Sequence, residues 1–245
     1  MKAPPCVNFE LLSECCLIMR IDDAINESYL PYLEYSCISA RAFFAEALID
    51  LVPSYNSLLV EFNCQLIQPQ QALEHFKRYL EENTASRGHN QLNLARSDSN
   101  NSIIEIPIYY HPEVGWDLEI LSEQLNLPWQ KIVEIHQSKR YRVYAMGFLP
   151  GFAFMGILHK RLHSHRKTEP RSFVPKGSLA IAERQTAIYP QDSPGGWNII
   201  GRCPIDLFNA TLNPVNTLSI YQTVHFKSIN RDEYLMLGGQ FEEQS

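Results

Sequence analysis

The sequence predicts an α+β fold in two parts, a small two-layer α/β domain followed by a domain of short strands. Two observations predict it. Residues 1–85 contain strand-like segments and two stretches with apolar residues at helical spacing. Residues 103–245 hold short apolar runs separated by glycine and proline, which is typical of a closed barrel or a sandwich. Residues 86–102 are polar and offer a core few side chains, so we expect them to form a linker.

The N-terminal domain is predicted to have the element order ββαββα. Val7–Ser13, Leu17–Ile21 and Leu58–Phe62 are expected to form strands because they are apolar runs bounded by polar turns. Ile25–Leu51 carries apolar residues at helical spacing. A second helix is expected to begin at Pro69, since proline is tolerated in the first helical turn. This order indicates an open sheet with two helices on one face.

The C-terminal domain is expected to open with a strand over Ile103–Tyr110, in which Pro107 indicates a sheet edge or a bulge. Asp117 is a candidate N-cap for a helix, and Pro128 begins another. A strand is then expected over Arg140–Met146. Further strands are expected over Ser178–Ile181, Thr186–Tyr189, Trp197–Ile200 and Leu218–Phe226, with a last packed segment at Tyr234–Leu237.

Glycine and proline are concentrated in the turns between Met146 and Arg202. Glycine allows positive φ or a close backbone approach, and proline fixes φ, so these turns are tightly specified. They are either the corners of a barrel or a surface for a ligand or partner built from those corners, because loops on a rigid scaffold often carry function.

Composition excludes several classes of protein. The chain of 245 residues is 45% hydrophobic and 20% charged, an ordinary globular balance. Its 27 acidic and 21 basic side chains give a net charge of −6, which argues against a general nucleic-acid binder. No apolar stretch approaches the ~20 residues that span a bilayer. The N-terminus lacks the apolar core of a signal peptide. We therefore expect a cytoplasmic protein whose six cysteines are reduced thiols.

Residues that could carry chemistry are few. Ser193 lies in a glycine- and proline-rich turn, where it serves either as a turn residue or as a nucleophile with His136 as its base. His136 is either a hydrogen-bonded core residue or a ligand. His159, His163 and His165 lie in a basic loop without a carboxylate or cysteine, so we expect a solvated or anion-facing loop and no metal site.

An ordered set of motifs in the second half resembles a known family. The motifs are Tyr141-Arg142-Val143-Tyr144, Gly147-Phe148-Leu149-Pro150-Gly151-Phe152, Pro170-Arg171, Val174-Pro175-Lys176-Gly177-Ser178, Gln185-Thr186-Ala187-Ile188-Tyr189-Pro190 and Ser193-Pro194-Gly195-Gly196-Trp197-Asn198-Ile199-Ile200-Gly201-Arg202. Together they are similar to the family of the 5-oxoprolinase B subunit, also described as allophanate hydrolase subunit 1-like, which includes an inhibitor of a sporulation histidine kinase. The N-terminal half is similar only in its order of elements.

The resemblance implies that the C-terminal domain is a cyclophilin-like β-barrel and that the chain is one subunit of an enzyme, inactive alone. With subunits C and A, such a protein cleaves 5-oxoproline (pyroglutamate) to L-glutamate. ATP, accompanied by Mg, is the co-substrate of the complex. The alternative is a non-catalytic regulator that binds and inhibits a sensor histidine kinase. A third possibility is an orphan amide-hydrolase or carboxylase-associated module.

The resemblance also implies a site. Activating a lactam requires cations and proton-transfer groups that face developing negative charge, and His136, Arg171 and Arg202 are the candidates. The residues expected to bind substrate or partner are Pro150, Gly151, Phe152, Gln185, Tyr189, Ser193, Gly195, Gly196 and Trp197. The hypothesis requires that Arg171, Arg202 and Trp197 share one recess.

Overall fold

The computed structural model describes residues 6–22, 26–86, 103–211 and 214–242. The chain forms two compact units, residues 1–101 and 102–245. Beyond Ser86 the predicted linker lies outside the described residues. In the part of the chain that the structure describes, no helix combines the length and the apolar character that crossing a bilayer requires.

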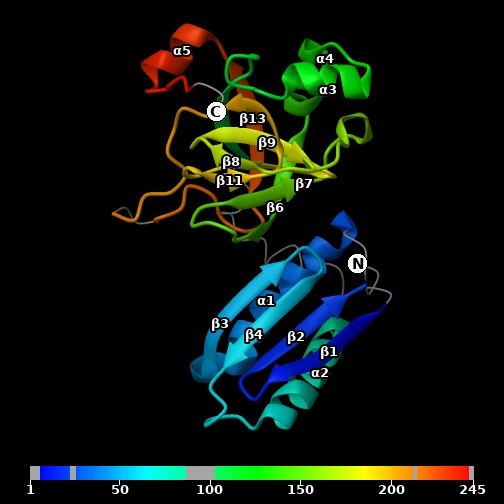
Figure 1. Cartoon of the computed structure of the whole chain (residues 1–245). Helices are drawn as coiled ribbons and strands as arrows, with labels where there is room; N and C mark the ends of the chain where they lie inside the picture. The colour runs from blue at the N-terminus through cyan, green and yellow to red at the C-terminus, as the bar shows by residue number, and fades with distance from the viewer. Residues whose placement is uncertain (1–5, 23–25, 87–102, 212–213, 243–245) are drawn as a thin grey trace. The chain divides into compact units, whose positions relative to one another are not determined.

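The N-terminal unit is an antiparallel sheet with two helices on one face (Figure 1). Its elements are β1 (Val7–Ser13), β2 (Cys16–Ile21), α1 (Leu30–Phe44), β3 (Leu48–Ser54), β4 (Ser57–Phe62) and α2 (Pro69–Ser86). The strand order is β1-β2-β4-β3. Alternate residues of β4, such as Leu58 and Val60, are fully buried, because the period of two points them at the helices. The predicted order ββαββα is confirmed.

The predicted helix over Ile25–Leu51 was too long at both ends. Its last residues belong to β3, where Leu48 pairs with Phe62 and Leu51 with Val60 of β4. Leu48 and Leu51 are three apart, a spacing that fits a helix, and only a bulge between Leu48 and Asp50 puts both on one face of the strand, opposite Phe62 and Val60. Ala45 separates the two elements, since its φ of 42° cannot continue a right-handed helix.

The C-terminal unit contains the predicted closed barrel, with strand order β10-β7-β6-β13-β5-β12-β9 and a β9–β10 pair that closes it. The barrel strands are β5 (Ile103–Tyr109), β6 (Arg140–Met146), β7 (Ala153–Gly156), β9 (Ser178–Ala182), β10 (Gln185–Ile188), β12 (Asn198–Arg202) and β13 (Thr223–Ile229). The last strand was predicted over Leu218–Phe226. It begins later because Tyr221, with φ of 67°, still belongs to the preceding turn.

Strand β9 is buried on both faces, and this positions the site. Leu179 and Ile181 point into the main core of the barrel. Ala180 and Ala182 point outward into a second cluster with Trp116, Tyr189 and Trp197. A two-stranded sheet of β8 (Arg171–Val174) and β11 (Ser193–Gly195), predicted only as turns, is separate from the barrel. Small alanines on the outer face leave room for the large aromatic rings.

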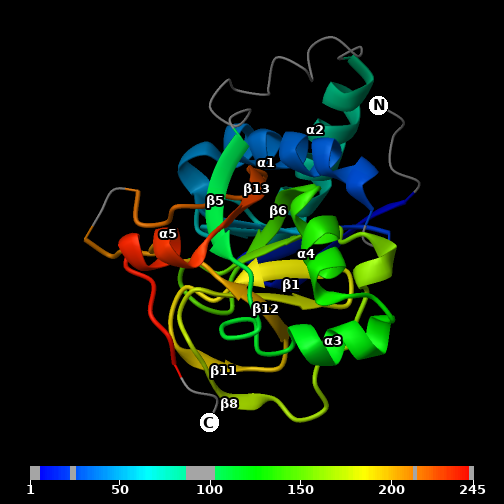
Figure 2. The ribbon, with the colours of Figure 1, turned by 90° about the horizontal axis from the view of Figure 1, so that it is seen from above.

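In the described part of this unit, three α-helices accompany the barrel, α3 (Leu118–Leu125), α4 (Trp129–Gln137) and α5 (Arg231–Met236). Figure 2 shows α3 and α4 side by side and β5 next to its parallel partner β13. Asp117 occupies the predicted N-cap position of α3, but its side chain makes no capping hydrogen bond. In the predicted segment Tyr234–Leu237 only Tyr234 is buried, and Met236 is 78% exposed.

Candidate functional site

A pocket of about 460 Å³ lies between the outer aromatic cluster and the β8–β11 sheet, and we call it the aromatic pocket. Its lining residues are Phe148, Leu149, Phe152, Phe154, Arg166, Lys167, Pro170, Tyr189, Ser193, Pro194, Gly195, Gly196 and Trp197. The lining combines flat aromatic surfaces with two cationic side chains. Such a combination suits a flat ligand that carries negative charge.

Phe152 organises the aromatic side of the pocket. Its ring centroid lies 5.3 Å from that of Tyr189 and 6.0 Å from that of Trp197, and both pairs are nearly perpendicular. Edge-to-face packing of this kind is favourable and fixes the ring orientations. Phe148 extends the cluster outward, 5.2 Å from Phe152 and 63% exposed, in a turn where its φ is 73°.

Gly195 is required by the packing of the pocket. A Cβ atom at Gly195 would lie 2.3 Å from the hydroxyl oxygen of Tyr189, which no side chain could tolerate. The same hydroxyl accepts a hydrogen bond from the backbone of Trp197. Burial raises the pKa of Tyr189, and this hydrogen bond opposes the rise only in part. Gly196 is different, because a Cβ atom there would meet nothing closer than 3.5 Å. Packing against Tyr189 therefore explains why residue 195 is a glycine, whereas no contact of this kind requires a glycine at position 196.

The cations of the pocket are held to different degrees. Arg166 is exposed and lies over the ring of Trp197 at 5.7 Å, and no ion pair involves it among the described residues. Lys167 donates to Asp117 Oδ1 at 2.8 Å, and Arg171 binds both oxygens of Asp117 at 2.8 and 2.9 Å. Arg171 thus belongs to the wall behind the pocket, with its charge shared with a carboxylate.

Asp117 is fully buried at the centre of this arrangement. Its Oδ2 also accepts from the backbone amide of Ile199 at 2.8 Å. Burial by itself would raise the pKa of Asp117, but the hydrogen bonds from Arg171, Lys167 and Ile199 outweigh it, and the pKa lies below its usual value. Asp117 is therefore an anion that ties the basic loop and β8 to β12. The sequence indicated Asp117 only as the N-cap of a helix, not as the partner of these cations.

Ser193 is 9% exposed, and its Oγ has no hydrogen-bond partner among the described residues. It lines the aromatic pocket, as the prediction required. The suggested pairing with His136 is wrong, since both ring nitrogens of His136 have other partners. His136 therefore cannot serve as a general base for Ser193.

His136 lies in the core, 0% exposed, against the rings of Tyr141 and Phe226, each 5.1 Å away, which also pack on each other at 5.5 Å. Thr186 donates its hydroxyl proton to Ala180 O, so the contact of 3.0 Å between Thr186 Oγ1 and His136 Nε2 requires a proton on Nε2. His136 Nδ1 then accepts from Tyr110 at 2.9 Å. Burial lowers the pKa of His136 to about 3, so the ring is neutral at physiological pH.

The remaining predicted residues are dispersed. Arg202 lines a different pocket, so Arg171, Arg202 and Trp197 do not share the single recess that was expected. The two arginines do share Trp116, whose ring lies 5.7 Å from the Arg171 guanidinium and 5.8 Å from that of Arg202. Gly151 is buried near Phe208, Pro150 is exposed in its turn, and Gln185 pairs with Gly156 and Ala182 in the barrel.

The lining also contains residues that were not predicted to bind substrate or partner, namely Phe148, Leu149, Phe154, Arg166, Lys167, Pro170 and Pro194. Arg166 and Lys167 are the last residues of the basic loop that was expected to be solvated or to face an anion. The basic composition of that loop was therefore a signal in the sequence for these two cations. In that loop His163 contacts Leu158 O and His165 contacts Glu183. Among the described residues, no group of three histidines, cysteines or carboxylates could hold a metal ion.

Comparisons agree with this architecture. The family described as Carboxyltransferase domain, subdomain C and D, matches residues 7–218. The urea carboxylase of Kluyveromyces lactis covers 96% of this chain, and the match spans 23% of that longer protein, with a TM-score of 0.69. At 14% identity that likeness shows the fold alone. The fold and the family match define a carboxyltransferase-domain protein.

More similar relatives narrow the assignment. The chain is 33% identical over 235 residues to the 5-oxoprolinase B subunit of Bacillus subtilis (strain 168), covering 92% of this chain and 94% of that protein. A conserved uncharacterised protein of Pyrococcus horikoshii is 31% identical, with a TM-score of 0.54 over 93% of this chain and 100% of that one. The chain belongs to the family of the 5-oxoprolinase B subunit.

Proposed function

We propose that the chain is the B subunit of an ATP-dependent 5-oxoprolinase and cleaves 5-oxoproline to L-glutamate together with subunits A and C. The observation that supports the proposal is the aromatic pocket, in a member of this family, with Arg166 and Lys167 beside Trp197. 5-Oxoproline is a flat lactam ring that bears a carboxylate. Aromatic faces suit the ring, and Arg166, which has no ion pair among the described residues, suits the carboxylate, whereas Lys167 is already paired with Asp117.

In this proposal the chain binds and orients the lactam. Arg166 contacts the substrate carboxylate, and the unpartnered Ser193 hydroxyl offers the lactam a hydrogen bond. Arg171 is a positioning residue, since it acts through Asp117 on the pocket wall. His136 and Arg202 lie outside the aromatic pocket and take no part in substrate binding there.

ATP is assigned to the complex. When bound, it would activate the lactam carbonyl by phosphoryl transfer. In the described part of the chain, no group of three histidines, cysteines or carboxylates could hold the accompanying Mg²⁺. Subunits A and C are proposed to supply those groups, which makes the isolated chain inactive.

The test reconstitutes the reaction from purified proteins. Subunits A and C are mixed with ATP, Mg²⁺ and 5-oxoproline, and glutamate release is measured with and without this chain. Loss of turnover on omission supports the proposal, and unchanged turnover removes the chain from the reaction. Arg166→Gln is expected to raise KM by about tenfold with a smaller effect on kcat. Arg184→Gln, a matched exposed control outside the pocket, is expected to leave both unchanged.

A further inference from the structure

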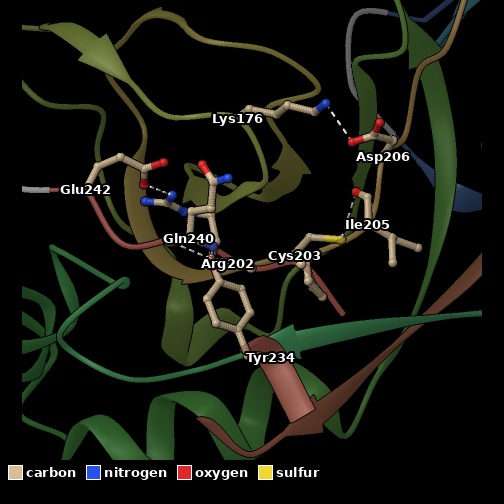
Figure 3. A pocket seen from close by; sticks show the side chains of 11 residues that line it. Lys176, Arg202, Cys203, Ile205, Asp206, Tyr234, Gln240 and Glu242 are labelled. Atoms are coloured by element: carbon tan, nitrogen blue, oxygen red, sulfur yellow. Dashed lines mark hydrogen bonds and ion pairs between the residues drawn. The ribbon is translucent and has the colours of Figure 1, made fainter. Parts of the chain in front are cut away.

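A second pocket, of about 200 Å³, lies beside Arg202, and we call it the Arg202 pocket (Figure 3). Arg202 ends β12, Lys176 lies in the turn before β9, and the residues after α5 complete the wall. Its polar side chains are Lys176, Arg202, Asp206, Tyr234, Gln240 and Glu242. This pocket is separate in its lining from the aromatic pocket, so the inference does not depend on the proposed activity.

Arg202 is a cation buried with donors to spare. The residue is 2% exposed, and its Nη1 is paired with the carboxylate of Glu242. Nε and Nη2 have no hydrogen-bond partner among the described residues. Burying polar donors without acceptors is costly, so such donors point to a ligand. Nε and Nη2 form one edge of the guanidinium plane, and that edge matches the two oxygens of a carboxylate.

The chain itself places Glu242 on this arginine. The hydroxyl of Tyr234 donates to Gln240 O at 2.7 Å and accepts from Gln240 N at 3.1 Å. Gly239 lies so close to the Tyr234 ring that a Cβ atom would be 2.3 Å from it. Phe241 packs on Tyr234 at 5.5 Å, beneath Arg231 at 4.7 Å. The segment from Gly239 to Glu242 is therefore a strap with its own anchors.

The charges in the pocket balance only while the strap is in place. Lys176 and Asp206 form an ion pair at 2.6 Å, and Glu242 neutralises Arg202. Glu242 is 34% exposed, so its carboxylate reaches the arginine from the solvent side. Moving Glu242 away leaves one net positive charge and a complete guanidinium fork. Those are the features that a small carboxylate requires.

We propose that the Arg202 pocket binds a small carboxylate on Arg202, and that Glu242 is an internal competitor which must leave for the ligand to bind. The strap closes the site in the isolated chain. Glu242 pairs with Nη1 and approaches from the solvent side, so its departure removes the competing charge and opens the way to the buried guanidinium. A carboxylate ligand, or the carboxylate side chain of a bound molecule, then takes the free Nε–Nη2 edge. No covalent step is involved.

The test uses acetate as the probe, titrated into the full-length ¹⁵N-labelled chain at constant ionic strength set with chloride. The resonances of the Arg202 Nε–H and of the Trp116 indole N–H beneath it report binding. We expect Glu242→Gln to lower the acetate midpoint by about tenfold, because the competing charge is lost. Asp232→Asn, which removes an exposed carboxylate from α5, is the matched control and should leave the midpoint at the wild-type value.

Arg202→Lys keeps the charge but loses the fork, so the Trp116 response to acetate should disappear. Equal midpoints for wild type and Glu242→Gln would overturn the proposal, as would an equal response to chloride. Tighter binding of phosphate than of acetate by Glu242→Gln would overturn the ligand class. If Arg202→Lys does not fold, the comparison of Glu242→Gln with Asp232→Asn decides alone.

Discussion

At the scale of single residues, Asp117 determines how the wall of the aromatic pocket is held. It is fully buried and accepts from Lys167, Arg171 and Ile199. Removing its charge leaves two cations without their acceptor in a mostly buried place. We expect Asp117→Asn to lower the free energy of unfolding by about 3 kcal/mol at pH 7, measured by urea denaturation.

The pH dependence of this contribution has a definite sign. The pKa of Asp117 is lowered in the folded state, so its stabilisation is present above the unfolded pKa of about 3.9 and is lost as pH falls through the folded pKa. The difference between wild type and Asp117→Asn should therefore shrink below about pH 4. Glu134→Gln, which breaks an exposed pair with Lys131, is the control and should cost no more than about 0.5 kcal/mol. Equal costs for the two variants would contradict the prediction.

His136 gives a second prediction at the same scale. Its folded pKa of about 3 lies below the unfolded value of about 6.5, so the unfolded chain binds a proton that the folded chain does not. Stability is therefore complete above about pH 6.5 and falls by about 1.4 kcal/mol per pH unit as pH drops toward about 3. We expect His136→Gln to reduce the slope of the unfolding free energy against pH, between pH 6 and 4.5, by about 1.4 kcal/mol per pH unit. That change corresponds to the loss of one titrating proton.

The control for His136 is His165, whose side chain is 95% exposed. His165→Gln should leave the slope as in wild type, because this ring is open to solvent and is not part of the core around His136. If His136→Gln and wild type have the same slope, His136 titrates normally and its neutrality in the core is wrong.

The candidate site could be predicted in part. The glycine- and proline-rich motifs located Phe152, Tyr189, Ser193 and Trp197, because tight turns require particular residue types that can be recognised in a sequence. The structure places these four residues around one pocket. That they bind substrate stays a prediction. The cations could not be assigned, since the partner of Arg171 lies 54 residues earlier, and no local pattern shows that a buried carboxylate meets it.

At the scale of elements, Ala45 ends α1 in an unfavourable backbone conformation. Its φ of 42° and ψ of −113° suit the first central residue of a type II′ turn, where glycine is preferred. The Ala45 side chain is exposed, so it loses no core contact on removal. We expect Ala45→Gly to raise the free energy of unfolding of the N-terminal unit by about 1 kcal/mol, seen as a rise of several degrees in Tm.

The same substitution in the middle of the helix should have the opposite sign. Ala40 is fully buried inside α1, and Ala40→Gly should destabilise the unit by about 1 kcal/mol or more. A lower Tm for Ala45→Gly would mean that the positive φ at Ala45 carries no strain.

Elements with one clear period could be predicted, and short or ambiguous ones could not. Arg140–Met146 was located to the residue because its apolar run is bounded by polar residues and a glycine. Leu48–Leu51 was assigned to a helix because two leucines three apart fit the helical period, and only the bulge between Leu48 and Asp50 lets both face the same side of a strand paired with β4. The three residues of β11 contain proline and glycine, so only their pairing with β8 reveals a strand.

At the scale of the whole molecule, each unit has a hydrophobic core of its own. Phe76 is fully buried in the N-terminal unit and packs against Phe43 and Phe44 at 5.5 and 5.3 Å. The barrel core instead centres on residues such as Val143 and Phe226. A unit with its own core can unfold as its own cooperative step.

The positions of the tryptophans allow this to be measured directly. Trp116, Trp129 and Trp197 are the three tryptophans of the chain, and all lie in residues 102–245. Tryptophan fluorescence, excited where tyrosine does not absorb, therefore reports the C-terminal unit alone, whereas far-ultraviolet circular dichroism reports both. Phe76→Ala should lower the free energy of unfolding of the N-terminal unit by about 3–5 kcal/mol. Part of the dichroism transition should then shift to a lower urea concentration, while the midpoint of the fluorescence transition stays unchanged. Phe226→Ala, the matched change in the barrel core, should move the fluorescence midpoint. A fluorescence midpoint that moves equally with Phe76→Ala would show that the two cores unfold in one cooperative step.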